Sequence, residues 1–176
     1  MLRFTSSALF AFHKTALLVT WFATLLCGGD LWAQYEVSSW RDHFPYGAAE
    51  EVIVANGEVV ARTPNALFSV DTATYEVSRF VKGQGLSQSN PSALGYDAIR
   101  DQWVVAYDDG GIDLRSSWGV TNIPDLRIAQ VVGSKRIQAV TIVGDDAYLS
   151  SAVGVIVLDL EKQEIADTWS LTPADV

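Results

Sequence analysis

The sequence predicts an all-β fold, a β-propeller of about three four-stranded blades in an incomplete ring. Three observations support this prediction: a 44-residue repeat, four short β-type segments in each repeat, and no sustained 3.6-residue apolar period outside the first 33 residues. A repeat of this length with four strands is typical of a propeller blade. Evenly spaced strands can also build one sandwich or barrel, but those folds do not require an ungapped repeat.

The first repeat shows the pattern clearly. We expect strands over residues 51–55, 59–62, 66–71 and 76–81, which are rich in β-branched and aromatic side chains. The dipeptide Asn56-Gly57 stands between the first two. It is a strong hairpin signal because both central residues of such a turn need positive φ.

The repeat runs without gaps through two further copies. Apolar positions and turn positions recur at an offset of 44 residues, although individual residues differ. This offset predicts two sets of equivalent strand positions: Phe68, Ile112 and Ile156, and Val70, Leu114 and Leu158.

The three blades are predicted at about 51–90, 91–134 and 135–176. Closed propellers typically have about 4–8 blades. Three blades alone would leave two broad sheet faces without a neighbour and would expose apolar surface. We therefore expect this chain to be the front part of a longer protein, or else to self-associate.

Residues 1–33 are predicted to be a signal peptide, with a positively charged start, an apolar run over 16–26 and a small residue, Ala33, before the cut. The apolar run is shorter than the roughly 20 residues of a spanning helix. An uncleaved anchor, or a lipoprotein modified at Cys27, is the alternative. No later run reaches spanning length, so we expect an exported protein of the periplasm, outer membrane or cell surface. Residues 34–50 form an N-terminal segment that could supply a ring-closing strand.

Composition narrows the chemistry. The chain of 176 residues carries a formal net charge of −9, which disfavours nucleic-acid binding because phosphate backbones are repelled. Cys27 is the only cysteine, and His43 is the only histidine after the predicted leader. We therefore expect no metal, no cofactor and no enzyme activity. The acidic stretch 108–113 is predicted to be a tight hairpin turn with solvated carboxylates rather than a calcium site.

Several segments of the chain carry a resemblance to a known family: residues 40–46, 67–69, 82–87, 105–114, 147–150 and 154–162. In these segments the sequence resembles the PorZ-like proteins, which are N-terminal β-propeller proteins of the type IX secretion system of Bacteroidetes. The Gly-Leu-Ser and Gly-Ile-x-Leu elements also look like the propeller repeats of two-component regulator sensors.

The resemblance implies a full-length family member with two propellers and a C-terminal sorting domain. It implies a place at the outer membrane or cell surface, and protein partners in the secretion and sortase complex that attaches cargo to anionic lipopolysaccharide. The predicted function is a non-catalytic interaction scaffold that handles lipopolysaccharide. The alternative is the extracytoplasmic ligand-sensing propeller of a hybrid two-component regulator.

The segment before the first blade holds the candidate contact residues Trp40, Arg41, Asp42 and His43. The main interpretation is structural, because such a segment often closes a propeller ring by pairing with the last blade. A partner contact is the second interpretation, and one half of an acid–base pair is the third.

Aromatic and basic side chains are the other candidates. Trp103, Tyr107 and Tyr148 are predicted to pack between blades, whereas Trp118 and Trp169 stand nearer strand ends, where an aromatic face can stack on a sugar. Five cations could meet an anionic glycan but are expected mainly as solvated surface: Arg62, Lys82, Arg127, Lys135 and Arg136.

Overall fold

The computed structural model describes residues 46–170, which belong to one compact unit of the chain. The predicted signal peptide lies outside the described residues, as do the four candidate contact residues Trp40, Arg41, Asp42 and His43.

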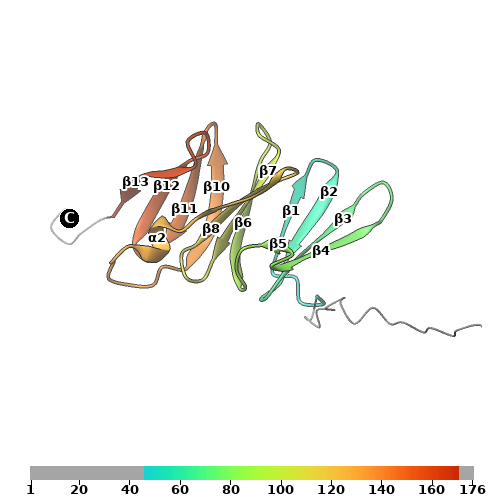
Figure 1. Ribbon diagram of the computed structural model, residues 1–176, viewed down its shortest axis with the longest axis horizontal. Coiled ribbons are helices and arrows are strands. Elements are labelled where there is room, and N and C mark those ends of the chain that lie inside the picture. The colour runs from blue at the N-terminus through green and yellow to red at the C-terminus, as the bar shows by residue number, and fades with distance from the viewer. Residues whose placement is uncertain (1–45, 171–176) are drawn as a thin grey trace, which may run out of the picture. The chain divides into compact units, whose positions relative to one another are not determined.

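The described residues form three sheets that follow one another in chain order and are antiparallel except for one short parallel pair in the first (Figure 1). The first blade contains β1 (Glu51–Ala55), β2 (Glu58–Arg62), β3 (Leu67–Asp71), β4 (Val77–Lys82) and the short β5 (Gly85–Leu86). The second contains β6 (Pro91–Asp97), β7 (Gln102–Tyr107), β8 (Ile112–Ser116) and β9 (Gly119–Ile123). The third contains β10 (Ile137–Val143), β11 (Asp146–Ser151), β12 (Gly154–Asp159) and β13 (Glu164–Trp169). The predicted all-β, incomplete propeller is confirmed.

Local sequence explains the hairpins. Asn56 and Gly57 have φ angles of 43° and 83°, so the predicted turn with two left-handed residues joins β1 to β2. At the end of β3, the Asp71 carboxylate accepts hydrogen bonds from the backbone N–H groups of Ala73 and Thr74 at 2.8 and 2.7 Å. This side chain closes the turn into β4.

Each pair of neighbouring sheets buries an apolar cluster between them. The cluster between the first and second blades consists of Ala55, Val60, Leu67, Leu86, Leu94, Trp103, Val105 and Tyr107. The cluster between the second and third blades is larger and also takes in Leu126 from α2 (Asp125–Ile128), a single helical turn in the connection between β9 and β10. Because side chains alternate along a strand, each blade presents one face to each neighbour.

The register of β8 differs from the ungapped 44-residue repeat. Arg62, Ala106 and Ser150 are spaced 44 residues apart, and they pair with Leu67, Ile112 and Val155. These three partners are spaced by 45 and then by 43 residues. The turn before β8 holds one more residue than its counterpart in the first blade.

This shift corrects the expected equivalences. Ala61, Val105 and Leu149 pair with Phe68, Asp113 and Ile156, whereas Ile112 points to the opposite face of its sheet. Likewise, Val59, Trp103 and Ala147 pair with Val70, Arg115 and Leu158. The second blade therefore carries an aspartate and an arginine at face positions where the other two blades carry apolar residues.

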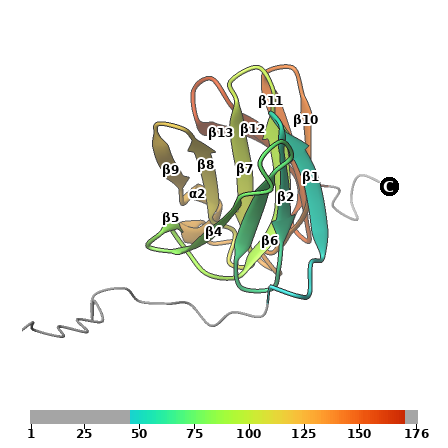
Figure 2. The ribbon, with the colours of Figure 1, turned by 90° about the vertical axis from the view of Figure 1, so that its right-hand side faces the viewer.

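The outermost sheet faces among the described residues are only partly covered: on the first blade Tyr46 packs against Phe68 and Arg79. On the first blade, which faces the viewer in Figure 2, the side chain of Val54 in β1 is 70% exposed. On the third blade, the side chain of Val143 in β10 is 61% exposed. Tyr148 was expected to pack between blades, but it lies on this outer face against Trp169, with ring centres 5.7 Å apart.

Candidate binding pocket between the first two blades

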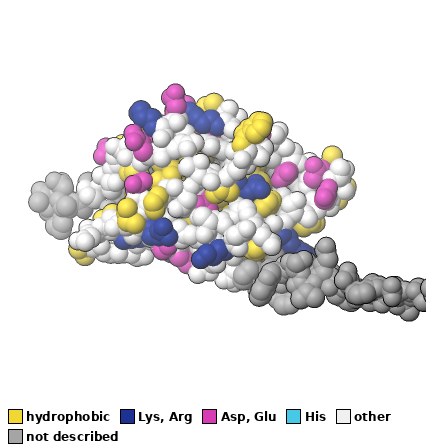
Figure 3. Space-filling view, viewed as in Figure 1, with side chains coloured by type: hydrophobic (Ala, Val, Ile, Leu, Met, Phe, Trp, Pro, Cys, Tyr) yellow, Lys and Arg dark blue, Asp and Glu magenta, His cyan; other side chains and the backbone are white. Residues whose placement is uncertain are grey.

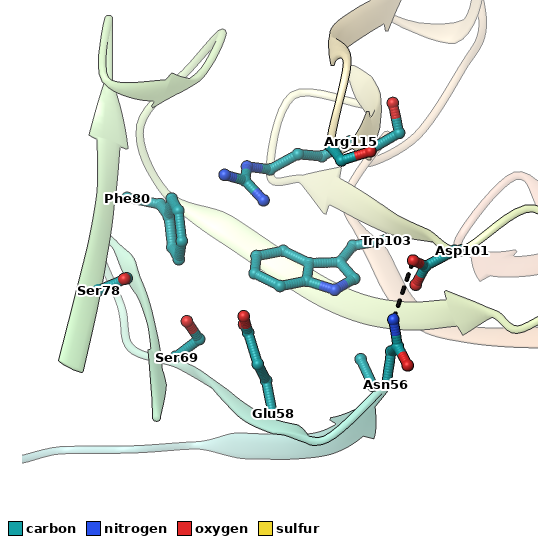
Figure 4. A pocket seen from close by; sticks show the side chains of 11 residues that line it. Asn56, Glu58, Ser69, Ser78, Phe80, Asp101, Trp103 and Arg115 are labelled. Carbon is teal, nitrogen blue, oxygen red and sulfur yellow. Dashed lines mark hydrogen bonds between the residues drawn. The ribbon is translucent and has the colours of Figure 1, made fainter. Parts of the chain in front are cut away.

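A pocket of about 400 Å³ opens between the first and second blades (Figure 4). Strands β2, β3 and β4 form one side, and β7 and β8 form the other. Its lining residues are Ala55, Asn56, Glu58, Ser69, Ser78, Phe80, Asp101, Trp103, Arg115, Ser116 and Ser117. The volume falls within the range of small-molecule sites. The lining is mostly polar, in contrast to the apolar clusters that neighbouring blades bury between them.

Arg115 is the central charged group of this pocket. Its guanidinium carbon lies 4.0 Å from the centre of the Phe80 ring and 4.6 Å from the centre of the Trp103 ring. The two rings meet edge to face at 5.2 Å, so they form a rigid aromatic corner for the guanidinium. Burial lowers the pKa of Arg115, and the negative charge of Glu58 partly opposes that shift. The guanidinium remains charged at any physiological pH.

Arg115 forms no ion pair with a carboxylate of residues 46–170. Arg62, which also points toward the second blade, is by contrast paired with carboxylates. Arg62 is 7% exposed and lies 2.7 Å from Glu50 and 3.1 Å from Glu51, and it also donates to the backbone carbonyl of Pro91. The expectation that Arg62 is solvated was therefore wrong. Its charge is neutralised within the first blade, and its hydrogen bond to Pro91 links that blade to the second.

The first blade supplies the polar wall of the pocket. Ser69 in β3 and Ser78 in β4 lie directly opposite each other, next to the acceptor side chain of Glu58 in β2. Ser69 is buried, and the paired register places Leu114 and Val157 at the equivalent positions of the other blades. Ser69 is therefore the residue of this wall that sets the first blade apart, since Ser78 stands where the other blades carry the polar residues Thr121 and Asp167.

Hydrogen bonds between turns fix the rim of the pocket. The Asn56 side-chain amide donates to the Asp101 carboxylate at 3.0 Å, and the Tyr96 hydroxyl donates to the other oxygen of Asp101 at 2.8 Å. Burial, followed by this hydrogen bond, raises the pKa of Tyr96. One hairpin along, Arg100 makes the corresponding link to Asp145 at 2.6 Å. The first hairpins of successive blades are therefore tied together.

Asp113 lies two residues from Arg115 on the same strand face and binds several polar groups at the interface between the first two blades. It is fully buried and accepts four hydrogen bonds: from the Ser87 N–H (2.8 Å) and hydroxyl (2.5 Å), the Tyr107 hydroxyl (2.5 Å) and the Asn122 amide (2.7 Å). Burial and the bond to Asp113 raise the pKa of Tyr107. The expectation of solvated carboxylates in this stretch was therefore wrong for Asp113, which anchors the connection between the blades.

The sequence identified some of these residues and missed others. Trp103 and Tyr107 belong to the cluster between the first two blades, as predicted. Glu58 and Arg115 were not singled out, because the ungapped repeat places Leu114 rather than Arg115 on this face. The sequence did contain a signal. Trp103, Val105 and Tyr107 share one face of β7 because side chains alternate along a strand. When β8 is aligned from the β8–β9 turn instead of from the repeat, Arg115 lies opposite Trp103 on that face.

Other candidates remain spread over the surface. Trp118 is 97% exposed at the β8–β9 turn, away from any aromatic partner among the described residues. Figure 3 shows basic side chains interspersed with acidic ones on one face rather than gathered into a basic patch. Within residues 46–170, no three His, Cys, Asp or Glu side chains are grouped for metal binding. The same residues contain no helix with the length and apolar character needed to cross a bilayer.

Residues 59–175, more than half of the chain, match the sequence profile of the family described as the PorZ N-terminal β-propeller domain of the type IX secretion system. The chain belongs to this family. Its fold is similar to that of PorZ from Porphyromonas gingivalis, with 30% sequence identity and a TM-score of 0.66. That protein is described as an essential bacterial surface component of the type IX secretion system. The match covers 69% of this chain and 17% of the PorZ chain, so the chain spans only a small part of that protein.

Two more distant structures share the fold alone. AztD from Citrobacter koseri is 15% identical with a TM-score of 0.54, and the match covers 75% of this chain and 37% of AztD. A chain of a nidogen–laminin complex is 16% identical with a TM-score of 0.52, and the match covers 76% and 52% of the two chains. No curated protein sequence matches the chain.

Proposed function

We propose that the chain is a non-catalytic interaction module of the type IX secretion system at the outer membrane or cell surface. It would contact protein partners in the secretion and sortase complex and take part in attaching cargo to anionic lipopolysaccharide. The observation that carries the proposal is the family match over residues 59–175, together with the similarity to a PorZ described as an essential surface component.

The chemistry of the pocket fits binding better than catalysis. Arg115 holds its proton at physiological pH, so it can donate hydrogen bonds and neutralise charge but cannot serve as an acid or a base. Asp101 accepts hydrogen bonds from Asn56 and Tyr96, which hold its carboxylate at the rim of the pocket. The site therefore offers recognition groups held in place by their neighbours.

The proposal is tested in the bacterium that encodes the chain. We would delete the gene, restore it with an affinity-tagged copy, and measure how much secreted cargo reaches the cell surface with lipopolysaccharide attached. We expect cargo to accumulate inside the deletion strain and the tagged protein to co-purify with secretion components. Normal cargo attachment, with co-purification of a membrane-bound histidine kinase instead, would overturn the proposal in favour of the sensor alternative.

A further inference from the structure

We infer that the pocket between the first two blades binds an acidic sugar unit, with its anionic group at Arg115 and its hydroxyl groups at Glu58 and the serine wall. The pocket is a binding site in its own right, and the inference depends on the proposed function only for the source of the sugar, which would be lipopolysaccharide.

Arg115 provides the first argument. A guanidinium charge that is half withdrawn from water normally pairs with a carboxylate, as Arg62 does with Glu50 and Glu51. Arg115 has no such partner in the described residues, and it stands where the other blades carry Val70 and Leu158. The rings of Phe80 and Trp103 restrict its orientation, so its planar donor fork is pre-organised for an oxyanion.

The opposite wall provides the second argument. Figure 4 shows Glu58 and Arg115 reaching toward the Trp103 ring from opposite blades. A carboxylate can only accept hydrogen bonds, so Glu58 requires donor groups on the ligand. A bare anion supplies none and is repelled by Glu58 and Asp101. A neutral sugar satisfies Glu58 but gives Arg115 no direct ion pair, since Glu58 acts on the guanidinium only through its charge at longer range. A sugar ring with one acidic group meets both requirements.

Size and lining limit the ligand further. The cavity of about 400 Å³ lies near the lower end of the usual range for small-molecule sites, which suits one sugar ring rather than an extended glycan. Four hydroxyl side chains can both donate and accept, as sugar hydroxyls do: Ser69, Ser78, Ser116 and Ser117. The same geometry accepts a carboxylate or a phosphate as the acidic group, because both match the guanidinium fork.

The experiment is calorimetric titration of the purified full chain with glucuronate, glucose 6-phosphate and glucose. We expect saturable binding of at least one of the two acidic sugars, and binding of glucose at least about tenfold weaker, since one charge-assisted pair is lost. The ratio of the dissociation constants of glucuronate and glucose 6-phosphate shows whether the pocket prefers a carboxylate or a phosphate.

Variants then locate the site. Arg115→Gln should weaken binding of the acidic sugar by about tenfold or more, and Arg115→Lys should restore part of it, because Lys keeps the charge but lacks the planar fork. Glu58→Gln tests the opposite wall and should weaken binding less. Arg136→Gln is the matched control: it removes an arginine that is outside the pocket and paired with Asp108, and it should leave binding unchanged.

A second readout protects the test against misfolded variants. In the unmodified chain, the Trp103 indole N–H resonance, assigned with Trp103→Phe, should shift on addition of the acidic sugar. The inference is overturned if neither acidic sugar binds, if Arg115→Gln binds as tightly as the unmodified chain, or if a short peptide binds in place of the sugars. None of these results would contradict the proposed function, provided that cargo attachment in the bacterium still depends on the gene.

Discussion

Arg115 lies directly opposite Trp103 across the β7–β8 pair, and its guanidinium carbon is 4.6 Å from the centre of the indole ring. The pair stands where the equivalent strands carry Val59 with Val70 and Ala147 with Leu158. An arginine at this position costs desolvation that a leucine would not, while its stacking on two rings returns part of that cost. The arrangement is therefore better explained by ligand recognition than by folding stability.

Replacing Arg115 with leucine should leave the stability of the fold nearly unchanged. The lost cation–π contacts are worth up to about 2 kcal/mol, and burial of a leucine side chain offsets a similar amount. We expect Arg115→Leu to change the free energy of unfolding by less than about 1 kcal/mol, measured by urea denaturation.

Replacing Arg62 provides the contrast. Arg62→Leu removes the partner of Glu50 and Glu51 and the donor to the Pro91 carbonyl, so groups at the blade junction lose their hydrogen bonds. Both glutamates are partly exposed, so we expect a loss of about 1–3 kcal/mol rather than the larger penalty of a fully buried pair. Equal effects of Arg62→Leu and Arg115→Leu would contradict the distinction between a structural and a binding arginine.

Asp113 should be the most sensitive carboxylate of the second blade. In Asp113→Asn one acceptor oxygen becomes an amide donor that faces the donors on Tyr107, Ser87 and Asn122. We expect a loss of about 2–3 kcal/mol in the free energy of unfolding. Glu161→Gln, at an exposed turn, is the matched control and should change it by less than about 0.5 kcal/mol. A mild Asp113→Asn phenotype would show that the four hydrogen bonds are dispensable.

Acid should weaken the turn after β3. The N–H groups of Thr74 and Ala73 lower the pKa of Asp71 below its ordinary value of 3.8. This contribution to stability is present above pH 3.8 and is lost as the pH falls through the lower folded-state pKa. Asp71→Asn should therefore flatten the loss of stability below pH 4, as followed by thermal unfolding between about pH 5 and 2. An identical loss of stability with falling pH in both proteins would show that the Asp71 turn does not contribute to acid sensitivity.

The exposed apolar residues on the outer faces should make the purified chain associate. Val54 and Val143 are exposed apolar side chains on the first and third blades, at opposite ends of the row of sheets. We expect sedimentation velocity to show mass rising with concentration, and Val54→Lys with Val143→Lys to reduce that rise. A strict monomer with a sharp cooperative melt would contradict this expectation.

Prediction from sequence succeeded where local signals are strong. The Asn56-Gly57 turn, the strands of the first blade and the three-blade repeat follow from side-chain chemistry and periodicity alone. The pocket did not follow, because the turn before β8 is one residue longer than in the first blade and the turn after β8 is two residues shorter, which the ungapped repeat hides. A slip of one residue reverses the face of every side chain, so the ungapped repeat assigns Arg115 and Asp113 to the wrong face of the second blade. The buried role of Arg62 was missed because its partners, Glu50 and Glu51, are revealed only when β1 and β2 pair.

If the pocket between the first two blades is the part of this propeller that acts in secretion, a substitution at Arg115 should impair cargo attachment in the cell. The most direct measurement is the amount of lipopolysaccharide-linked cargo on the surface of cells that carry Arg115→Gln at the chromosomal gene, with Arg136→Gln as the control and with equal levels of both proteins. We expect a severalfold fall for Arg115→Gln and none for Arg136→Gln. Equal cargo attachment in the two strains would contradict it.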